Sequence, residues 1–469
     1  MSGPHPPDQP GPDSLRLVPD PSLRVLDGGR ALLGGSPLRV LRLGAAGAAL
    51  VARWLDGDPV TPRAAERALA DRIVHSGLAH PRYPASRWGP ADVAVVIPVR
   101  DDTAGAARVA DAVAGVADVL VVDDGSAAPV PGAAVRHRRP RGPAAARNAG
   151  WHRTTAPLVA FLDADTAPPP GWLDPLLAQF ADPAVAAVAP RVRSLPGPGA
   201  LARYERARSS LDLGAEPGPV RPGGRIGHVP SAALVVRAEA LAEVGGFDES
   251  LRFGEDVDLV WRLVAAGYQV RYEPAAEVGH APRASWAGWV RQRFAYGTSA
   301  APLARRHGSA VAPVRLSVWS AAAWAALLLG RRGTGAALVA TSAALLVRKL
   351  GRVGVPGQEA VRLAALGHLG AVRLLADALA RPWAPLAWPL LRTRSGRIAA
   401  GLIAARHLVA WWRERPELDP VRWTAARLAD DLAYGAGVCW GALRERSAGA
   451  LLPHLTDLPG RSSVPVRGA

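Results

Sequence analysis

Two aspartates separated by one residue, Asp163 and Asp165, directly follow an apolar run at residues 158–162. Alternate side chains of an extended chain point to the same side, so these two carboxylates would lie close together. Carboxylates held that close repel each other unless a cation lies between them. Hard divalent cations such as Mg²⁺ or Mn²⁺ prefer oxygen ligands and keep coordination positions open for phosphate oxygens. The pair therefore predicts a Mg²⁺ or Mn²⁺ site that would bind a diphosphate and neutralise it as a leaving group.

A second acidic motif, Glu255 and Asp256, follows Gly254 and begins a segment with apolar residues at positions 257, 260, 261 and 264. Acids in the first turn of a helix are stabilised by the helix dipole by about 0.3–1 kcal/mol, which is a purely structural explanation for them. The functional interpretation is a general base, because a hydroxyl acceptor must lose its proton to a nearby carboxylate when it attacks.

Polar residues at two other strand ends are candidates for binding a nucleotide. Pro98 removes a backbone donor at the end of an apolar run and would open the chain toward a crevice. Asp124 ends a second apolar run and precedes Gly125, so its carboxylate could accept hydrogen bonds from a base such as uracil, although a simple Asp-Gly turn is the alternative. The donor-binding candidates at these strand ends are Pro98, Val99, Arg100, Asp101 and Asp124, and Arg147, Asn148 and Ala164 are further candidates for binding the donor.

Three further polar side chains could complete the site. Arg147 and Asn148 lie in a predicted helix at residues 143–153, where Arg147 could bind a phosphate or stabilise Asp124. His280 follows a predicted strand at residues 269–272. A neutral imidazole nitrogen could supply a third metal ligand, although a lone histidine is more often structural.

The apolar pattern predicts the elements that must position these residues. Continuous apolar runs at residues 93–98, 119–122 and 158–162 are typical of buried parallel strands. Helical patterns at residues 104–116 and 143–153 separate them. This alternation predicts an α/β domain with a doubly wound, mostly parallel sheet over residues 91–308. Ligands of such sheets bind at the carboxyl ends of the strands, where the candidate residues lie.

The N-terminal part of the chain is expected to hold a small separate module. Residues 1–13 are rich in Pro, Gly and Asp and are expected to be disordered. Within residues 14–84, Asp27-Gly28-Gly29 between two short apolar runs indicates a β-hairpin. Two helical patterns follow at residues 45–55 and 62–75. This order has the outline of a winged-helix unit.

Residues 309–469 are expected to form a basic helical region. The chain carries a net charge of +16, and residues 301–469 hold 23 basic and 9 acidic side chains, a net of +14. Two apolar runs at residues 316–330 and 333–347 are each shorter than the roughly 20 residues of a straight membrane span. A tilted hairpin, interfacial helices and buried core helices all remain open. The charge suits an anionic membrane surface, and a basic helical domain in solution is the alternative.

The sequence favours a reducing compartment. Cys439 is the single cysteine, so an internal disulfide and a cysteine-based metal site are excluded. The N-terminus lacks the charged-then-apolar pattern of a secretory signal. We therefore expect a cytoplasmic enzyme associated with the inner face of the plasma membrane.

Together these motifs resemble the family 2 glycosyltransferases of the GT-A fold over residues 91–308. The resemblance implies that Asp124 and the strand end at Pro98 hold the nucleoside, and that Asp256, in the Glu255-Asp256 motif, is the catalytic base. It implies a metal-binding Asp163-Ala164-Asp165 motif with His280 as an additional ligand. It also assigns Arg293 to a helix, residues 289–297, that closes over the donor. The reaction implied is an inverting, metal-dependent sugar transfer.

The N-terminal module indicates which class of acceptor the enzyme uses. Residues 15–81 resemble the small winged-helix peptide-recognition modules that accompany radical-modified peptide pathways. Combined with a family 2 transferase, this resemblance implies that glucose from UDP-glucose is added as a short β-linked chain to a peptide-derived redox cofactor.

The alternatives to this function are a membrane transferase, a peptide-binding scaffold and a nucleic-acid binder. A membrane transferase acting on a polyprenyl phosphate or another lipid or polysaccharide acceptor is the nearest, because of the C-terminal apolar runs. A peptide-binding scaffold with a degenerate transferase domain is disfavoured by the acids at positions 124, 163, 165 and 256. A nucleic-acid binder would interleave aromatic residues in its strands, whereas the strands here are aliphatic, so no nucleic-acid partner is expected.

Overall fold

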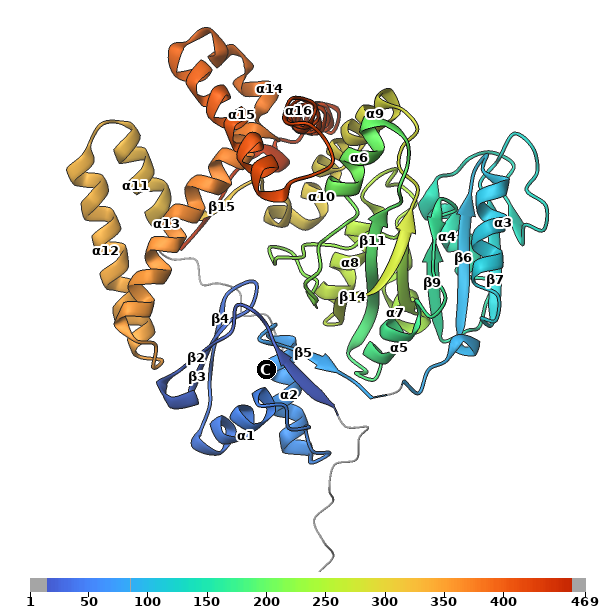
Figure 1. The fold of residues 1–469 in the computed structure, drawn as a ribbon, viewed down its shortest axis with the longest axis horizontal. Helices are drawn as coiled ribbons and strands as arrows, with labels where there is room; N and C mark the ends of the chain where they lie inside the picture. Colours follow the sequence, from blue (N-terminus) through green and yellow to red (C-terminus); the bar gives the residue numbers. More distant parts are fainter. Residues whose placement is uncertain (1–14, 85, 458–469) are drawn as a thin grey trace, which may run out of the picture.

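The computed structural model describes residues 15–84 and 86–457, so the expected disorder of residues 1–13 lies outside the described residues. Three parts of the chain can be followed in Figure 1. The N-terminal module lies beneath both an α/β domain and a group of C-terminal helices. The boundaries given above for these parts remain predictions.

The N-terminal module has its own apolar core. Its elements are β1 (Arg16–Pro19), β2 (Arg24–Leu26), η1 (Asp27–Gly29), β3 (Ala31–Gly34), β4 (Arg39–Arg42), α1 (Ala45–Leu55), α2 (Ala64–His75) and β5 (Ala79–Arg82). Strands β2, β3 and β4 form an antiparallel sheet, and β1 pairs with β5. Gly28 and Gly29 supply the positive φ angles, 57° and 90°, that the predicted hairpin turn requires. Trp54 of α1, 1% exposed, fills the core between the helices and strands.

The α/β domain is built on a nine-stranded sheet. Its strands are β6 (Val93–Val99), β7 (Asp118–Asp123), β8 (Val135–Arg136), β9 (Leu158–Leu162), β10 (Thr166–Ala167), β11 (Val185–Ser194), β12 (Gly218–Pro219), β13 (Ala233–Arg237) and β14 (Gln269–His280). Their order is β10-β14-β11-β13-β9-β6-β7-β8, with β12 paired to β14.

The sheet is mixed, and the prediction of a mostly parallel sheet is confirmed in part: β6, β7, β8, β9, β11 and β14 run in one direction, and β10, β12 and β13 run in the other. Strands β6, β7, β8 and β9 pair in parallel, as the βαβ pattern predicted, and β11 pairs in parallel with β14. Strand β13, however, runs antiparallel to both of its neighbours, and β10 and β12 run antiparallel to β14. The chain between β11 and β13 returns in the opposite direction, so the parallel crossover rule stops applying after β9.

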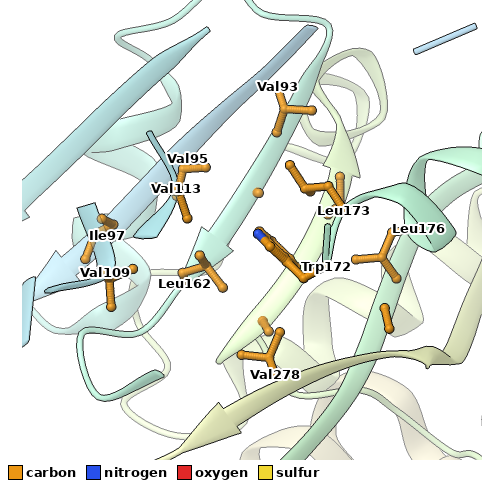
Figure 2. Packing of buried hydrophobic residues seen from close by; sticks show 14 of the residues in the cluster. Val93, Val95, Ile97, Val109, Val113, Leu162, Trp172, Leu173, Leu176 and Val278 are labelled. Carbon is orange, nitrogen blue, oxygen red and sulfur yellow. The ribbon is translucent and has the colours of Figure 1, made fainter. Parts of the chain in front are cut away.

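Helices cover both faces of the sheet. They are η2 (Pro90–Asp92), α3 (Thr103–Ala112), α4 (Pro143–Trp151), α5 (Asp174–Gln179), α6 (Gly199–Arg208), α7 (Ala238–Val244), α8 (Glu255–Ala265), α9 (Trp286–Thr298), α10 (Ala300–His307) and η3 (Gly308–Val311). On one face, Val95 and Ile97 of β6 pack with α3 and α5 around Trp172 (Figure 2). On the other face, Val96 and Phe161 pack with α4, α7 and α8. Burial on both faces explains the continuous apolar runs.

The C-terminal region is helical, apart from two short strands that pair with each other. Its elements are β15 (Arg315–Ser317), α11 (Val318–Leu328), α12 (Arg332–Gly351), α13 (Gly357–Ala380), α14 (Ala384–Ala387), η4 (Trp388–Arg392), α15 (Arg394–Glu414), α16 (Pro420–Arg444), η5 (Gly449–Leu451) and β16 (His454–Thr456). Helices α11 and α12 form a hairpin that extends away from the α/β domain beside α13 (Figure 1).

The two apolar runs singled out in the sequence form α11 and α12. Within the described part of the chain, the helix with the length and apolarity of a membrane span is α13 instead, with a mean hydropathy of 1.4 and 22% of its apolar window buried. Helix α16 packs closely on α9, where Gly437 lies against the carbonyl of Phe294. The C-terminal helices are therefore attached to the part of the α/β domain that carries Arg293.

Candidate active site

One guanidinium group, that of Arg147, joins the two acidic motifs. Its Nη2 donates to Oδ1 of Asp163 at 2.7 Å, and its Nη1 donates to Oε1 of Glu255 at 2.9 Å. Gly142, with φ of 102°, and Pro143 begin α4 so that Arg147 lies in its second turn, buried to 4% side-chain exposure. A buried guanidinium needs charged partners, and two carboxylates provide them. The predicted metal motif and the predicted base motif therefore lie side by side.

Two successive residues connect Asp163 with Asp256. The backbone N–H of Ser231 points to Oδ2 of Asp256 at 3.4 Å, and the carbonyl of Ala232 accepts from the N–H of Asp163 at 3.0 Å. Asp256 lies in the first turn of α8, half-buried, and its Oδ1 accepts from the N–H of Val257 at 2.8 Å. The carboxylate proposed as the base thus lies at the carboxyl ends of the central strands.

His280 lies beside the second aspartate of the metal motif. The sequence predicted that His280 follows a strand at residues 269–272. The strand is longer: His280 is the last residue of β14 and pairs with Thr166 of β10. Its Nε2 is 3.2 Å from Oδ1 of Asp165. The side chain of Asp163 turns toward Arg147 instead. Within residues 15–84 and 86–457, no three His, Cys, Asp or Glu side chains form a ready-made metal cluster.

Burial and neighbouring charges shift the pKa values of Asp163, Asp165 and Glu255. Burial raises the pKa of the Asp163 carboxyl, and the negative charge of Asp165 adds to the effect although Arg147 opposes it. Burial alone would raise the pKa of Asp165, but the hydrogen bond and charge of His280 hold it below its ordinary value. Burial, followed by the charge of Asp256, raises the pKa of Glu255 to about 7. Burial is therefore the largest cause that raises the pKa of Asp163 and of Glu255, and a neighbouring carboxylate adds to it in each case.

Asp124 fastens the loop that leads into α4. Its Oδ1 accepts from Nδ1 of His137 at 2.7 Å and from the N–H of Arg141 at 2.8 Å, and its Oδ2 accepts from the N–H of Gly142 at 2.8 Å. The carboxylate is buried, 6% exposed. Asp124 thereby positions Arg147 through the start of the helix. Its predicted contact with a nucleobase remains a prediction.

The end of β6 turns outward as the sequence indicated. Asp101 adopts a positive φ of 59°, and its Oδ1 accepts from the N–H of Ala127 at 2.8 Å. Arg100 is exposed, with its Nε 3.6 Å from Asp101. Pro98 is half-buried, whereas Val99 and Ala164, 3% and 8% exposed, pack in the core. Arg100 and Asp101 are therefore the side chains at this strand end that are accessible to a ligand.

Two predicted donor-binding residues lie in other networks. Asn148 uses its amide to hold the chain at Phe247, accepting from its N–H at 2.9 Å and donating to its carbonyl at 2.8 Å. Arg293 is 1% exposed, with Glu205 and Asp430 each 3.6 Å away. Neither side chain is bonded to Asp163, Asp165, Glu255 or Asp256, because each is held by other partners that are distant in the sequence.

Three more side chains border the site, Arg283 before α9 and Gln292 and Tyr296 on it, and none of the three was assigned an individual role from the sequence beyond the placing of α9 as the helix that closes over the donor. Arg283 lies 4.0 Å from Asp165 and donates to Oε1 of Gln292 at 2.9 Å. The same amide oxygen accepts from the hydroxyl of Tyr296 at 2.9 Å, and burial raises the pKa of Tyr296 to about 12. Gln292 and Tyr296 are four residues apart, the spacing that places two side chains on one helix face. That spacing is the sequence signal that could have identified them.

Comparisons with known proteins show the family to which the chain belongs. The family model described as "Glycosyl transferase family 2" matches residues 94–245, from β6 to α7. The pre-mycofactocin glycosyltransferases of two Mycobacterium tuberculosis strains, CDC 1551 / Oshkosh and ATCC 25618 / H37Rv, are 41% identical over 470 residues, which is 95% of this chain and 98% of theirs. The succinoglycan biosynthesis protein ExoU of Rhizobium meliloti is 35% identical over 221 residues, 41% of this chain and 62% of that protein.

A solved structure is also similar at low identity. The mannosyltransferase PcManGT from Pyrobaculum calidifontis, in complex with GDP-Man and Mn²⁺, is 20% identical with a TM-score of 0.35, covering 61% of this chain and 90% of that chain. The family is shown by the relatives that match nearly the full length of the chain, together with the family model. This chain belongs to the family 2 glycosyltransferases, in the same family as the pre-mycofactocin glycosyltransferase of M. tuberculosis.

Proposed function

We propose that this glycosyltransferase transfers glucose from UDP-glucose to the precursor of mycofactocin, a peptide-derived redox cofactor, and builds a short β-linked oligosaccharide on it. The acceptor is supported by the 41% identity to the pre-mycofactocin glycosyltransferases. The observation that carries the chemistry is the guanidinium of Arg147, which holds Asp163 and Glu255 at 2.7 and 2.9 Å beside Asp256.

In the proposed reaction, Asp256 accepts the proton of the acceptor hydroxyl. The oxygen of that hydroxyl attacks the anomeric carbon from the face opposite the diphosphate. The new carbon–oxygen bond forms as the bond from the anomeric carbon to the β-phosphate oxygen breaks, and UDP leaves. One displacement converts an α-linked donor into a β-glycoside through an oxocarbenium-like transition state. A positioned base contributes about 10²–10⁴-fold to such a step.

Arg147 and Glu255 would hold the base motif in place. Glu255 is buried and bonded to Arg147, so the first turn of α8 cannot rotate without breaking that contact. We assign Glu255 and Arg147 to positioning, and Asp256 to proton transfer.

Asp163, Asp165 and His280 are the residues that would hold a divalent cation, Mg²⁺ or Mn²⁺. Two carboxylates and one imidazole are a donor set that suits hard divalent cations. Burial and the charge of Asp165 raise the pKa of Asp163, and a bound cation would relieve that repulsion. Such a cation would compensate the negative charge of the diphosphate.

The flanking regions would bring the acceptor and the enzyme together. The N-terminal module is the proposed holder of the peptide-derived acceptor. The C-terminal helices are the proposed contact with the inner face of the plasma membrane, because Trp388, Leu402 and Trp412 are 63%, 67% and 62% exposed, and the guanidinium of Arg415 lies over the ring of Trp412 at 5.5 Å. The same exposed apolar side chains favour the second candidate acceptor, a polyprenyl phosphate.

Mass spectrometry of acceptors incubated with a panel of UDP-sugars and Mn²⁺ tests this function. We expect hexose addition to the mycofactocin precursor with UDP-glucose. Transfer to polyprenyl phosphate with none to the precursor would replace the first acceptor by the second. No sugar transfer to either acceptor from any donor would refute both.

A further inference from the structure

A single loop, residues 217–232, runs between the N-terminal module and the catalytic carboxylates. Its base is closed by a bridge between Val220 and Ile226 and by the N–H of Arg221, which donates to the carbonyl of Ile226 at 3.0 Å. Val220 and Ile226 are 2% and 4% exposed and pack in the core beneath the sheet. The loop is therefore fixed at its base, and we call it the coupling loop.

The tip of the coupling loop is bonded to the N-terminal module. Nη2 of Arg225 lies 3.3 Å from Oδ2 of Asp20, and Nη2 of Arg221 donates to the carbonyl of His75 at 2.6 Å. Asp20 is itself fixed inside the module, because its carboxylate is 2.9 Å from Nε2 of His80 and accepts from the N–H of Ser22 at 2.8 Å. A movement of the module would therefore move Arg225.

A cavity of about 120 Å³ lies at this junction, and Asp20, Ser36, Pro219 and Arg225 are among the residues that line it. The junction is thus not filled by apolar side chains here. The polar contacts of Arg225 and Arg221 carry the link between the tip and the module at this point.

The other arm of the coupling loop ends on the catalytic residues. The carbonyl of Gly227 accepts from Nε1 of Trp261, on the same helix as Asp256, at 2.7 Å. Ser231, 2% exposed, points its N–H to Asp256, and the carbonyl of the next residue accepts from the N–H of Asp163. The path from Arg225 to Ser231 is only a few residues long and is buried at Ile226 and from Val229 to Ser231, so little slack separates the module contact from the base.

We propose that Arg225 is a positioning residue: its contact with Asp20 sets the coupling loop, and the coupling loop orients Asp256 through Ser231. The N-terminal module thereby acts on the reaction as well as on acceptor binding. This inference rests on the proposed role of Asp256 as the base. Small misplacements of a catalytic group are expensive in rate, because the reacting atoms must be held in near-attack geometry.

Kinetics of three variants test the coupling. Arg225→Met removes the charge but keeps most of the side-chain volume, Arg225→Lys keeps the charge, and Arg24→Met removes the 3.1 Å contact of the module with Glu359 of α13, away from the loop. We expect Arg225→Met to lower kcat for transfer roughly tenfold while the KM for UDP-glucose stays unchanged. Arg225→Lys should restore most of the turnover, and Arg24→Met should behave as wild type.

Hydrogen exchange measures the same coupling without any acceptor. We expect the amides of residues 227–232 to exchange faster in Arg225→Met than in wild type or Arg24→Met, while those of β6 are unchanged. Unchanged exchange in residues 227–232, whatever the turnover, would overturn the coupling. Failure of the wild type to glycosylate the mycofactocin precursor would instead refute the proposed acceptor and leave the exchange comparison valid.

Discussion

Asp163 and Glu255 are held by opposite nitrogens of one guanidinium group, at 2.7 Å and 2.9 Å from Arg147. They lie far apart in the sequence, Asp163 directly after β9 and Glu255 at the start of α8. This contact fixes the distance between the predicted metal motif and the predicted base motif.

Replacing Arg147 with Met should destabilise the protein by about 3–5 kcal/mol, because it leaves buried carboxylates without their partner. The matched control is Arg141→Met, which removes an ion pair with Glu249 whose two side chains are 56% and 39% exposed. That change should cost at most about 1 kcal/mol. Urea unfolding followed by tryptophan fluorescence measures both. Equal stability of the two variants would show that Arg147 does not hold the acids together.

Glu255→Gln should remove a specific pH dependence of stability. The folded protein holds the pKa of Glu255 at about 7, above the ordinary value of 4.5. The folded state therefore binds more protons between these values, so the stability contributed by protonated Glu255 is fully present below about pH 4.5 and is lost as the pH rises through 7.

The free energy of unfolding of wild type, relative to Glu255→Gln, should thus fall between pH 5 and pH 7 by at most about 1.4 kcal/mol per pH unit. Urea titrations at several pH values measure the difference. If it is constant across that range, Glu255 does not titrate there.

Several elements were predicted from the sequence because the pattern is local. The apolar runs at β6 and β9 and the helical pattern of α1 give their bounds to within a residue, since burial on both faces or on one helix face is visible in the sequence. Strands β11 and β13 were not predicted, and the antiparallel direction of β13 depends on a return of the chain that no local pattern encodes.

The site was predicted in part for the same reason. Acids at strand ends are visible in the sequence, and Asp163, Glu255 and Asp256 do converge. The partners of Arg147 could not be predicted from the sequence, because they depend on which carboxylates are nearest in space. Arg293 was assigned to the donor because residues 289–297 resemble the family's closing helix, but Asp430 of the C-terminal helices lies 3.6 Å from its Nε.

Asp165→Ala should weaken metal-dependent binding of UDP. The variant removes a carboxylate that lies 3.2 Å from His280 and leaves fewer oxygen ligands for Mg²⁺ or Mn²⁺. Calorimetric titration with UDP, with and without Mn²⁺, measures the effect. The control is Asp248→Ala, which removes a partly exposed acid that lies between α7 and α8 and pairs with Arg306 of α10. Identical Mn²⁺-dependent affinities in Asp165→Ala and wild type would exclude this metal site.

Trp388 and Trp412 should mediate binding to an anionic bilayer. Both are more than half exposed, and Trp side chains near arginines are favoured at a bilayer surface. Co-sedimentation with vesicles of phosphatidylserine and phosphatidylcholine should fall when both are changed to Ser, whereas Val25→Ser, 50% exposed on the N-terminal module, should bind as wild type. Wild type that stays in the supernatant with such vesicles would rule out this surface as a membrane contact.

The most direct test of the account is sugar transfer by Asp256→Asn compared with wild type. The amide keeps the shape of the side chain and cannot accept the acceptor proton, so turnover should fall by about 10²–10⁴-fold. Binding of UDP-glucose in the presence of Mn²⁺ should remain, because the donor site is formed by other residues. Turnover close to that of wild type would contradict the account, since the proton would then leave through another group.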